Sequence, residues 1–146
     1  MSRVSTYLNF KGQTEEAFRY YAKVFGTEIT GPIFRMGDIP GGPGAPQLPA
    51  AEKDLVMHIE LPILADHILM GTDMVESLGQ KVKVGNNTTI NLEPDSKEEA
   101  NRLYDALSDG GSESTGMQQQ PWGYWGCTLD RFGIRWMVNF AEQSQA

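Results

Sequence analysis

Apolar and polar residues alternate along several short segments of the chain, and a period of two is typical of β-strands. In VSTYLNF, residues 4–10, the apolar Val4, Leu8 and Phe10 share one phase, and Tyr7 and Asn9 share the other. The same kind of pattern predicts further strands at residues 27–36, 54–61, 66–73, 86–93, 114–118, 124–129 and 134–140.

Two segments have helical spacing instead. Thr14 is the expected N-cap of the first helix, which ends at Gly26. Asp95 or Ser96 is the expected N-cap of the second helix, which ends at Gly110 and Gly111.

The two helices begin with the same residues, which indicates an internal repeat. Glu15-Glu16-Ala17 and Tyr21 recur as Glu98-Glu99-Ala100 and Tyr104, an offset of 98 − 15 = 83 residues. Each half therefore reads as strand, helix and three strands. We predict one domain of two modules, about residues 1–74 and 86–146, with a connector between them. The Pro/Gly-rich residues 37–53 are expected to lack regular structure, as a free loop or as a lid.

Composition and charge narrow the class of protein. The net charge of −7 and the lack of a basic stripe argue against nucleic-acid binding. No apolar run has the roughly 18 residues of a membrane span, and the first residues do not resemble a secretory signal. A single cysteine, Cys127, fits a reducing compartment. The sequence thus predicts a cytoplasmic protein with no membrane partner.

Strand alternation divides the side chains between two faces of each sheet. If helices cover one face, the apolar phase forms the core and the other phase faces a cleft. The predicted core residues are Leu8, Phe10, Met57, Ile59, Leu61, Ile90, Leu92, Trp136, Val138 and Phe140. The predicted cleft residues are Ser5, Tyr7, Asn9, His58, Glu60, Thr89, Asn91, Arg135, Met137 and Asn139.

His58 and Glu60 are the strongest candidates for chemistry, because residues two apart on a strand share a face. A carboxylate beside an imidazole can fix its tautomer and support general base catalysis. The alternative is a solvated surface ion pair. Cys127 is interpreted as a small buried residue and His67 as a structural histidine, whereas Trp125 fits either face.

Several aromatic and turn residues receive structural interpretations. Trp136 is assigned to the core, and Tyr124 stays open as a possible pocket wall beside Trp125. Asp130 in the DRFG turn is expected to bond its own backbone, and Asp73 is expected to do the same.

Three stretches carry a resemblance to a known family: YLNFKGQTEEAFRYYAKVFG, VMHIEL and the final WG…DRFGIRWMV. They resemble the PhnB-like branch of the glyoxalase/bleomycin-resistance/dioxygenase superfamily, the vicinal oxygen chelate proteins. The resemblance implies an α+β fold of paired βαβββ modules, which form a curved mixed sheet around a cleft with the helices outside. It also implies a homodimer. Some members are labelled ubiquinone-pathway methyltransferases, but no glycine-rich loop suited to such a cofactor is visible.

The metalloenzymes of this superfamily take metal ligands from the first and last strand of each module. Carried over, these positions fall at Ser5, at Leu69 or Met70, and at Thr89 and Met137. None of these residues is a usual ligand for a hard divalent ion, and a shift of two residues brings in only Tyr7 or Asn91. We therefore expect no metal and no other cofactor.

These observations favour a metal-independent protein that binds a small molecule in a cleft between modules or subunits. Its expected ligand-binding residues are Tyr7, Asn9, Asn91, Trp125 and Met137. The alternative is a metal-dependent lyase, isomerase or dioxygenase with His58 and Glu60 as catalytic residues. A purely structural role through a dimer interface is a third possibility, which no motif supports or excludes.

Overall fold

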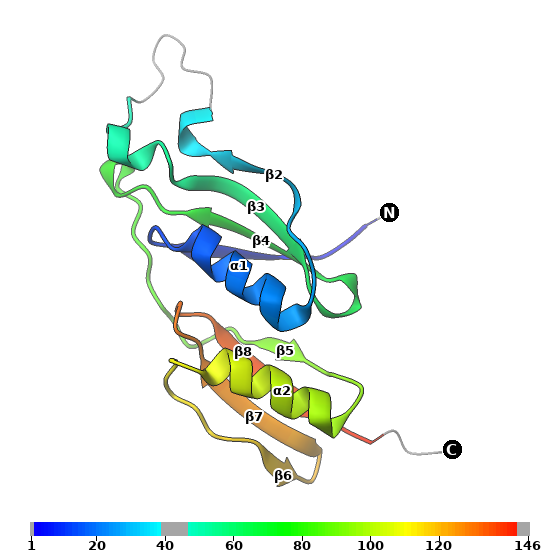
Figure 1. The fold of residues 1–146 in the computed structure, drawn as a ribbon. Coiled ribbons are helices and arrows are strands. Elements are labelled where there is room, and N and C mark those ends of the chain that lie inside the picture. The colour runs from blue at the N-terminus through cyan, green and yellow to red at the C-terminus, as the bar shows by residue number, and fades with distance from the viewer. Residues whose placement is uncertain (1, 39–46, 143–146) are drawn as a thin grey trace. The chain divides into compact units, whose positions relative to one another are not determined.

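Each half of the chain folds as a strand, a helix and three further strands (Figure 1). The computed structural model describes residues 2–38 and 47–142. The chain divides into two compact units, Met1–Lys83 and Val84–Ala146. The boundary lies within the segment predicted to connect two modules. The element order confirms the predicted α+β fold of two βαβββ modules.

The first unit holds a mixed sheet with the strand order β1-β4-β3-β2. The first strand, β1, is parallel to β4, whereas β3 is antiparallel to both of its neighbours. The chain passes through α1, β2 and β3 before β4 returns to pair with β1 in the parallel direction. The elements are β1 (Thr6–Phe10), α1 (Thr14–Phe25), β2 (Thr30–Arg35), β3 (Val56–Pro62) and β4 (Ile68–Asp73).

The second unit repeats this topology with the strand order β5-β8-β7-β6. Its first strand is again parallel to its last, and β7 is antiparallel to β6 and β8. The elements are β5 (Ile90–Leu92), α2 (Lys97–Ser108), β6 (Gln118–Gln120), β7 (Gly123–Leu129) and β8 (Arg135–Phe140).

The two helices begin in different ways. The predicted N-cap Ser96 is confirmed, because its side chain accepts a hydrogen bond from the backbone N–H of Glu99. Thr14 was wrongly predicted as the cap of α1: it is the first helical residue, after the N-cap Gln13. Its backbone N–H and its hydroxyl both donate to Asp73, at 3.1 and 2.6 Å, so a residue of β4 satisfies this helix terminus.

The buried residues follow the predicted alternation in most strands. Seven of the predicted core residues are buried: Leu8, Phe10, Ile59, Leu61, Leu92, Trp136 and Val138. Met57 was wrongly placed in the core, since it is half-buried and Val56 takes the buried position. The cause is a bulge in β3, where Val56 and His58 pair with the consecutive residues Arg35 and Phe34. The predicted core residues Ile90 and Phe140 are only half-buried.

Some predicted strands are shorter in the structure. Val4 precedes β1 and is 83% exposed. The strand predicted at residues 86–93 is reduced to β5, Ile90–Leu92: Ile90 pairs with Trp136, the second residue of β8, so residues before position 89 would lie beyond the start of β8. The strand predicted at residues 114–118 begins only at Gln118, after two residues with positive φ, Glu113 and Gly116.

The Pro/Gly-rich segment is only partly described. Its residues 39–46 lie outside the described part of the chain, so the lid interpretation stays untested. Contrary to the prediction, short 3₁₀-helices lie at both of its ends, at Met36–Asp38 and Ala50–Glu52. Two more 3₁₀-helices lie at Leu64–Asp66 and Glu76–Leu78. Within the described residues, no helix is long and apolar enough to cross a membrane.

Candidate functional site

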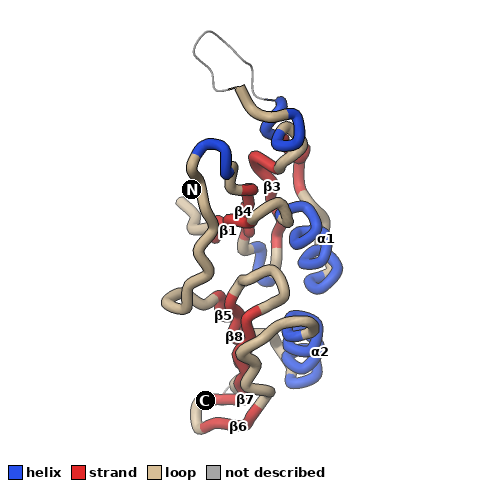
Figure 2. Tube along the Cα trace, turned by 90° about the vertical axis from the view of Figure 1, so that its left-hand side faces the viewer, coloured by secondary structure: helices blue, strands red, loops and turns tan. Residues whose placement is uncertain are grey.

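In each unit the helix packs against one face of the sheet (Figure 2). We call the other side the open face. On β1, Leu8 and Phe10 are buried, whereas Tyr7 and Asn9 are exposed on the open face. On β8, Trp136 and Val138 are buried, whereas Met137 and Asn139 have the opposite phase. The predicted division between core and open face is therefore correct for these strands.

His58 and Glu60 lie side by side on the open face of the first unit. The His58 Nε2 and Glu60 Oε1 atoms are 3.4 Å apart, and Arg3 Nη2 lies 3.7 Å from the same carboxylate oxygen. The side chains of His58 and Glu60 are 30% and 31% exposed. A half-buried imidazole–carboxylate pair of this kind can exchange hydrogen bonds with a bound molecule.

Aromatic and thioether side chains surround this pair. The ring centroids of Tyr7 and His58 are 6.2 Å apart with an interplanar angle of 35°. Met70 on β4 is opposite both Tyr7 and Glu60, so it lies between these two residues in the sheet. Phe34 on β2 is opposite His58. Tyr7 is 49% exposed and Phe34 is 44% exposed, so the open face offers accessible apolar area beside polar groups.

Two of the metal-ligand positions that the family resemblance implied, Ser5 and Met70, lie on the same face. Leu69 is fully buried, which leaves Met70 as the candidate on β4. The Ser5 hydroxyl lies 3.7 Å from the Met70 sulfur. A hydroxyl and a thioether do not suit a hard divalent ion. Over residues 2–38 and 47–142, no group of three or more His, Cys, Asp or Glu side chains is placed to hold a metal ion. The donor set thus does not fit the superfamily's metal.

The open face of the second unit has a different composition. Asn91 is opposite Met137, and Met137 is opposite Cys127. Trp125, which the sequence could not assign to either face, shares the phase of Cys127 and so lies on the open face. Cys127 is half-buried rather than fully buried, and desolvation raises the pKa of its thiol while Arg135 opposes this shift.

Tyr124 is a pocket wall, as predicted, but it lines a cavity of about 400 Å³ on the helix side of the sheet, together with Lys97 and Trp122, and not the open face. Its hydroxyl donates to Asn101 Oδ1 on α2 at 2.6 Å, and Lys97 Nζ lies 4.4 Å from the centre of its ring. The tyrosine therefore fastens α2 to β7. Trp122 contacts the edge of Trp125, with 6.2 Å between the ring centroids.

Asp130, Asp73 and His67 each make side-chain hydrogen bonds that bear on their predicted structural roles. Asp130 bonds its own turn as predicted, through the N–H groups of Phe132 and Ile134, and it also accepts from Trp136 Nε1. Asp73 was wrongly predicted to shape its own turn, because it accepts from Thr14 and from the Val56 N–H. His67 has the expected structural partner, the Thr6 hydroxyl at 2.9 Å.

The predicted site residues fall into two groups, one in each unit. Tyr7, Asn9, His58 and Glu60 lie on the first open face, and Asn91, Trp125 and Met137 lie on the second. Their roles in binding stay predictions. Sequence reasoning missed Phe34, because the irregular pairing of β2 hides which of its residues are exposed. It also missed Arg3, which precedes the first strand.

Comparison with known proteins agrees with this architecture. The family model described as 3-demethylubiquinone-9 3-methyltransferase matches residues 2–139. The crystal structure of protein PA1353 from Pseudomonas aeruginosa is 32% identical, with a TM-score of 0.82 over 98% of this chain and 100% of that chain. The PhnB protein from Bacillus cereus is 22% identical, with a TM-score of 0.74 over 96% and 100% of the two chains.

A more distant solved structure has the same fold. A glyoxylase/bleomycin resistance protein/dioxygenase domain from Frankia sp. EAN1pec is 12% identical, with a TM-score of 0.66 over 99% of this chain and 96% of that chain. At this identity the similarity concerns the fold alone. It confirms the glyoxalase/bleomycin-resistance architecture that the sequence motifs predicted.

Proposed function

We propose that this chain, which belongs to the family described as 3-demethylubiquinone-9 3-methyltransferase and has the glyoxalase/bleomycin resistance fold, binds a small molecule without a metal ion. The ligand is an aromatic compound that carries a hydrogen-bond donor. It binds on the open face of the first unit. The observation that carries this proposal is the placement of two exposed aromatic side chains, Tyr7 and Phe34, beside His58 and Glu60.

The chemistry of this face supports an aromatic ligand. Tyr7 and Phe34 present ring faces or edges to a planar compound, and Met70 adds a polarisable thioether between strands. The Glu60 carboxylate accepts a hydrogen bond from a ligand hydroxyl or amine, and His58 lies beside it to donate or accept another. Such sites combine apolar walls with a few placed polar groups.

The donor atoms support independence from metal. The two positions on this face that correspond to superfamily ligands are Ser5 and Met70. The competing function is metal-dependent lyase, isomerase or dioxygenase chemistry, for which His58 and Glu60 would have to supply the ligands. The name of the family refers to methyl transfer, a third activity, which requires a bound methyl donor.

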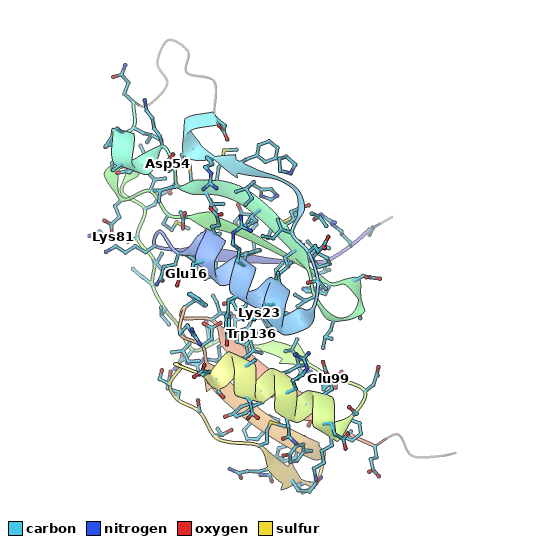
Figure 3. The ribbon with its side chains drawn as sticks, viewed as in Figure 1. Glu16, Lys23, Asp54, Lys81, Glu99 and Trp136 are labelled. Atoms are coloured by element: carbon cyan, nitrogen blue, oxygen red, sulfur yellow. The ribbon has the colours of Figure 1, made fainter. Side chains whose placement is uncertain are left out.

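One titration series separates these functions. Calorimetric titration with a panel of phenols and aromatic amines is carried out with and without EDTA, and the metal content of the untagged protein is measured beforehand. We expect binding that EDTA leaves unchanged, and a loss of about tenfold in affinity for Tyr7→Ala and for Glu60→Gln. Glu16→Gln, on the first turn of α1 (Figure 3), is the matched control and is expected to bind normally.

Other outcomes would replace the proposal. Stoichiometric metal that disappears in a folded His58→Ala variant would establish the metal-dependent activity. Binding of S-adenosylmethionine in preference to the aromatic panel would favour methyl transfer.

We also propose a homodimer, as the family resemblance implies. Sedimentation velocity tests it, and a monomer at tens of micromolar would contradict it.

A further inference from the structure

We propose that a cavity beside Arg135, in the second unit, binds the carboxylate group of a small organic acid. The cavity has a volume of about 360 Å³ and is lined by Val84, Gly85, Asn86, Glu113 and Arg135. This site shares no residue with the ligand site proposed on the first unit, and neither proposal depends on the other.

Arg135 is held in place by the sheet. It is the first residue of β8 and lies opposite Leu129 on β7, so its side chain stands on the open face. Its side chain is only 17% exposed. A guanidinium that is mostly buried keeps its charge and needs acceptors around it.

The acceptors present do not satisfy this guanidinium. Its Nη2 donates to Glu113 Oε2 at 3.0 Å. Its Nε is buried and has no hydrogen-bond partner among residues 2–38 and 47–142. A carboxylate that binds an arginine in the bidentate manner engages two N–H groups at once, and Glu113 engages one here. The unpaired Nε–H is covered in the structure, so it becomes a second donor for a carboxylate only when the Arg135 and Glu113 side chains shift and expose it.

Glu113 is suited to be a displaceable counter-ion. Its side chain is 57% exposed, so water can solvate it as soon as it leaves Arg135. Its backbone has a φ of 51°, in the left-handed region that non-glycine residues rarely adopt. A ligand carboxylate would replace the Glu113 carboxylate on Nη2 and add the bond to Nε.

The charge of the lining favours a carboxylate over a doubly charged phosphate. Val84 is the one apolar side chain among the lining residues. Arg135 is the one cation among the residues that line the cavity, which suits a single negative charge. Asn86 adds an amide that can donate to a ligand oxygen.

Benzoate is the probe that tests this site, with benzamide as its uncharged isostere and inorganic phosphate as the competing oxyanion. The full-length protein labelled with ¹⁵N is titrated, and the Arg135 Nε–H resonance is followed by NMR. We expect benzoate to shift this resonance, and benzamide to leave it in place. We expect Glu113→Gln to tighten benzoate binding about two- to fivefold, because it removes the competing carboxylate.

Variants of arginine complete the test. Arg135→Gln is expected to weaken benzoate binding at least about tenfold, and Arg135→Lys, which keeps the charge but loses the planar fork, is expected to weaken it as well. Arg131→Gln is the matched control, since Arg131 pairs with Asp109 in the same unit. Weaker or unchanged binding in Glu113→Gln, which changes an exposed residue, would overturn the proposal. Tighter binding of phosphate than of benzoate would overturn the choice of a carboxylate.

Discussion

The two units share one topology, but each holds its helix on the sheet by different contacts. In the first unit, Asp73 on β4 ties the start of α1 to β3 through Thr14 and Val56. Phe18 on α1 packs directly on Gly71, where an added Cβ would lie 2.6 Å from the ring. A common element order therefore fixes the position of a helix without fixing the residues that hold it.

In the second unit, the stabilising contacts come from a tyrosine on α2 and from the turn between β7 and β8. The Tyr104 hydroxyl on α2 donates to the Cys127 carbonyl and accepts from the Gly116 N–H. Asp130 closes the turn between β7 and β8 and binds the buried Trp136. At the register position of Gly71, opposite the first strand, this unit has Val138. The open faces differ in the same way: one presents Tyr7 beside a histidine–carboxylate pair, and the other presents Arg135.

The largest expected effect comes from the two buried carboxylates. Asp73 and Asp130 are 3% and 4% exposed, and each accepts at least three hydrogen bonds. Asp73→Asn and Asp130→Asn replace an acceptor by a donor that faces other donors. We expect each to lower the free energy of unfolding by about 2–4 kcal/mol, measured by urea denaturation followed by circular dichroism.

Amide hydrogen exchange would show where each substitution acts. We expect Asp73→Asn to reduce protection chiefly in α1 and β3, and Asp130→Asn to reduce it chiefly in β7 and β8. Asp54→Asn, at an exposed aspartate before β3 (Figure 3), is the control and should change little. Equal losses of protection in both units for both variants would show that these carboxylates do not stabilise their units separately.

Much of this fold could be predicted from the sequence, because hydrophobic alternation and helix signals are local. The repeat of Glu15-Glu16-Ala17 at Glu98 and the Ser96 cap are both visible in the printed residues. The role of Asp73 is not visible, because its partner Thr14 lies 59 residues away. The β3 bulge was missed for a similar reason: it depends on how β2 pairs, which alternation in one strand does not reveal.

The candidate sites were less predictable than the fold. Alternation placed Tyr7, His58 and Glu60 on one face, since residues two apart on a strand point the same way. It could not show that Phe34 lies opposite His58, or that the Arg135 Nε lacks an acceptor. Such facts depend on pairing between strands and on the packing of individual atoms.

A smaller effect is expected at the helix N-termini. The Ser96 hydroxyl accepts from the Glu99 N–H at 3.1 Å, whereas the Gln13 side chain makes no capping hydrogen bond. Ser96→Ala should therefore lower the unfolding free energy by about 1 kcal/mol, and Gln13→Ala should leave it nearly unchanged. Thermal denaturation compares the two variants. A larger loss for Gln13→Ala would indicate that α1 depends on a contact of Gln13 rather than on Asp73.

The smallest effect, and the one that depends on pH, concerns the first-turn glutamates. Hydrogen bonds from Arg35 and Arg19 lower the pKa of Glu15, and a hydrogen bond from Arg102 lowers the pKa of Glu99. A carboxyl whose pKa is lower in the folded state stabilises the protein above its ordinary pKa. That stability is lost as the pH falls through the folded value, below about pH 5.

Glu15→Gln should consequently cost less than about 1 kcal/mol at pH 7, and the difference from the wild type should shrink at pH 3. Glu99→Gln should behave in the same direction with a smaller cost, because Glu99 has one arginine partner and Glu15 has two. Urea denaturation at both pH values measures the four differences. If Glu99→Gln cost more than Glu15→Gln, the second arginine would contribute nothing to the stability of the first unit, and Arg35 would pair with Glu15 only as a solvated surface contact.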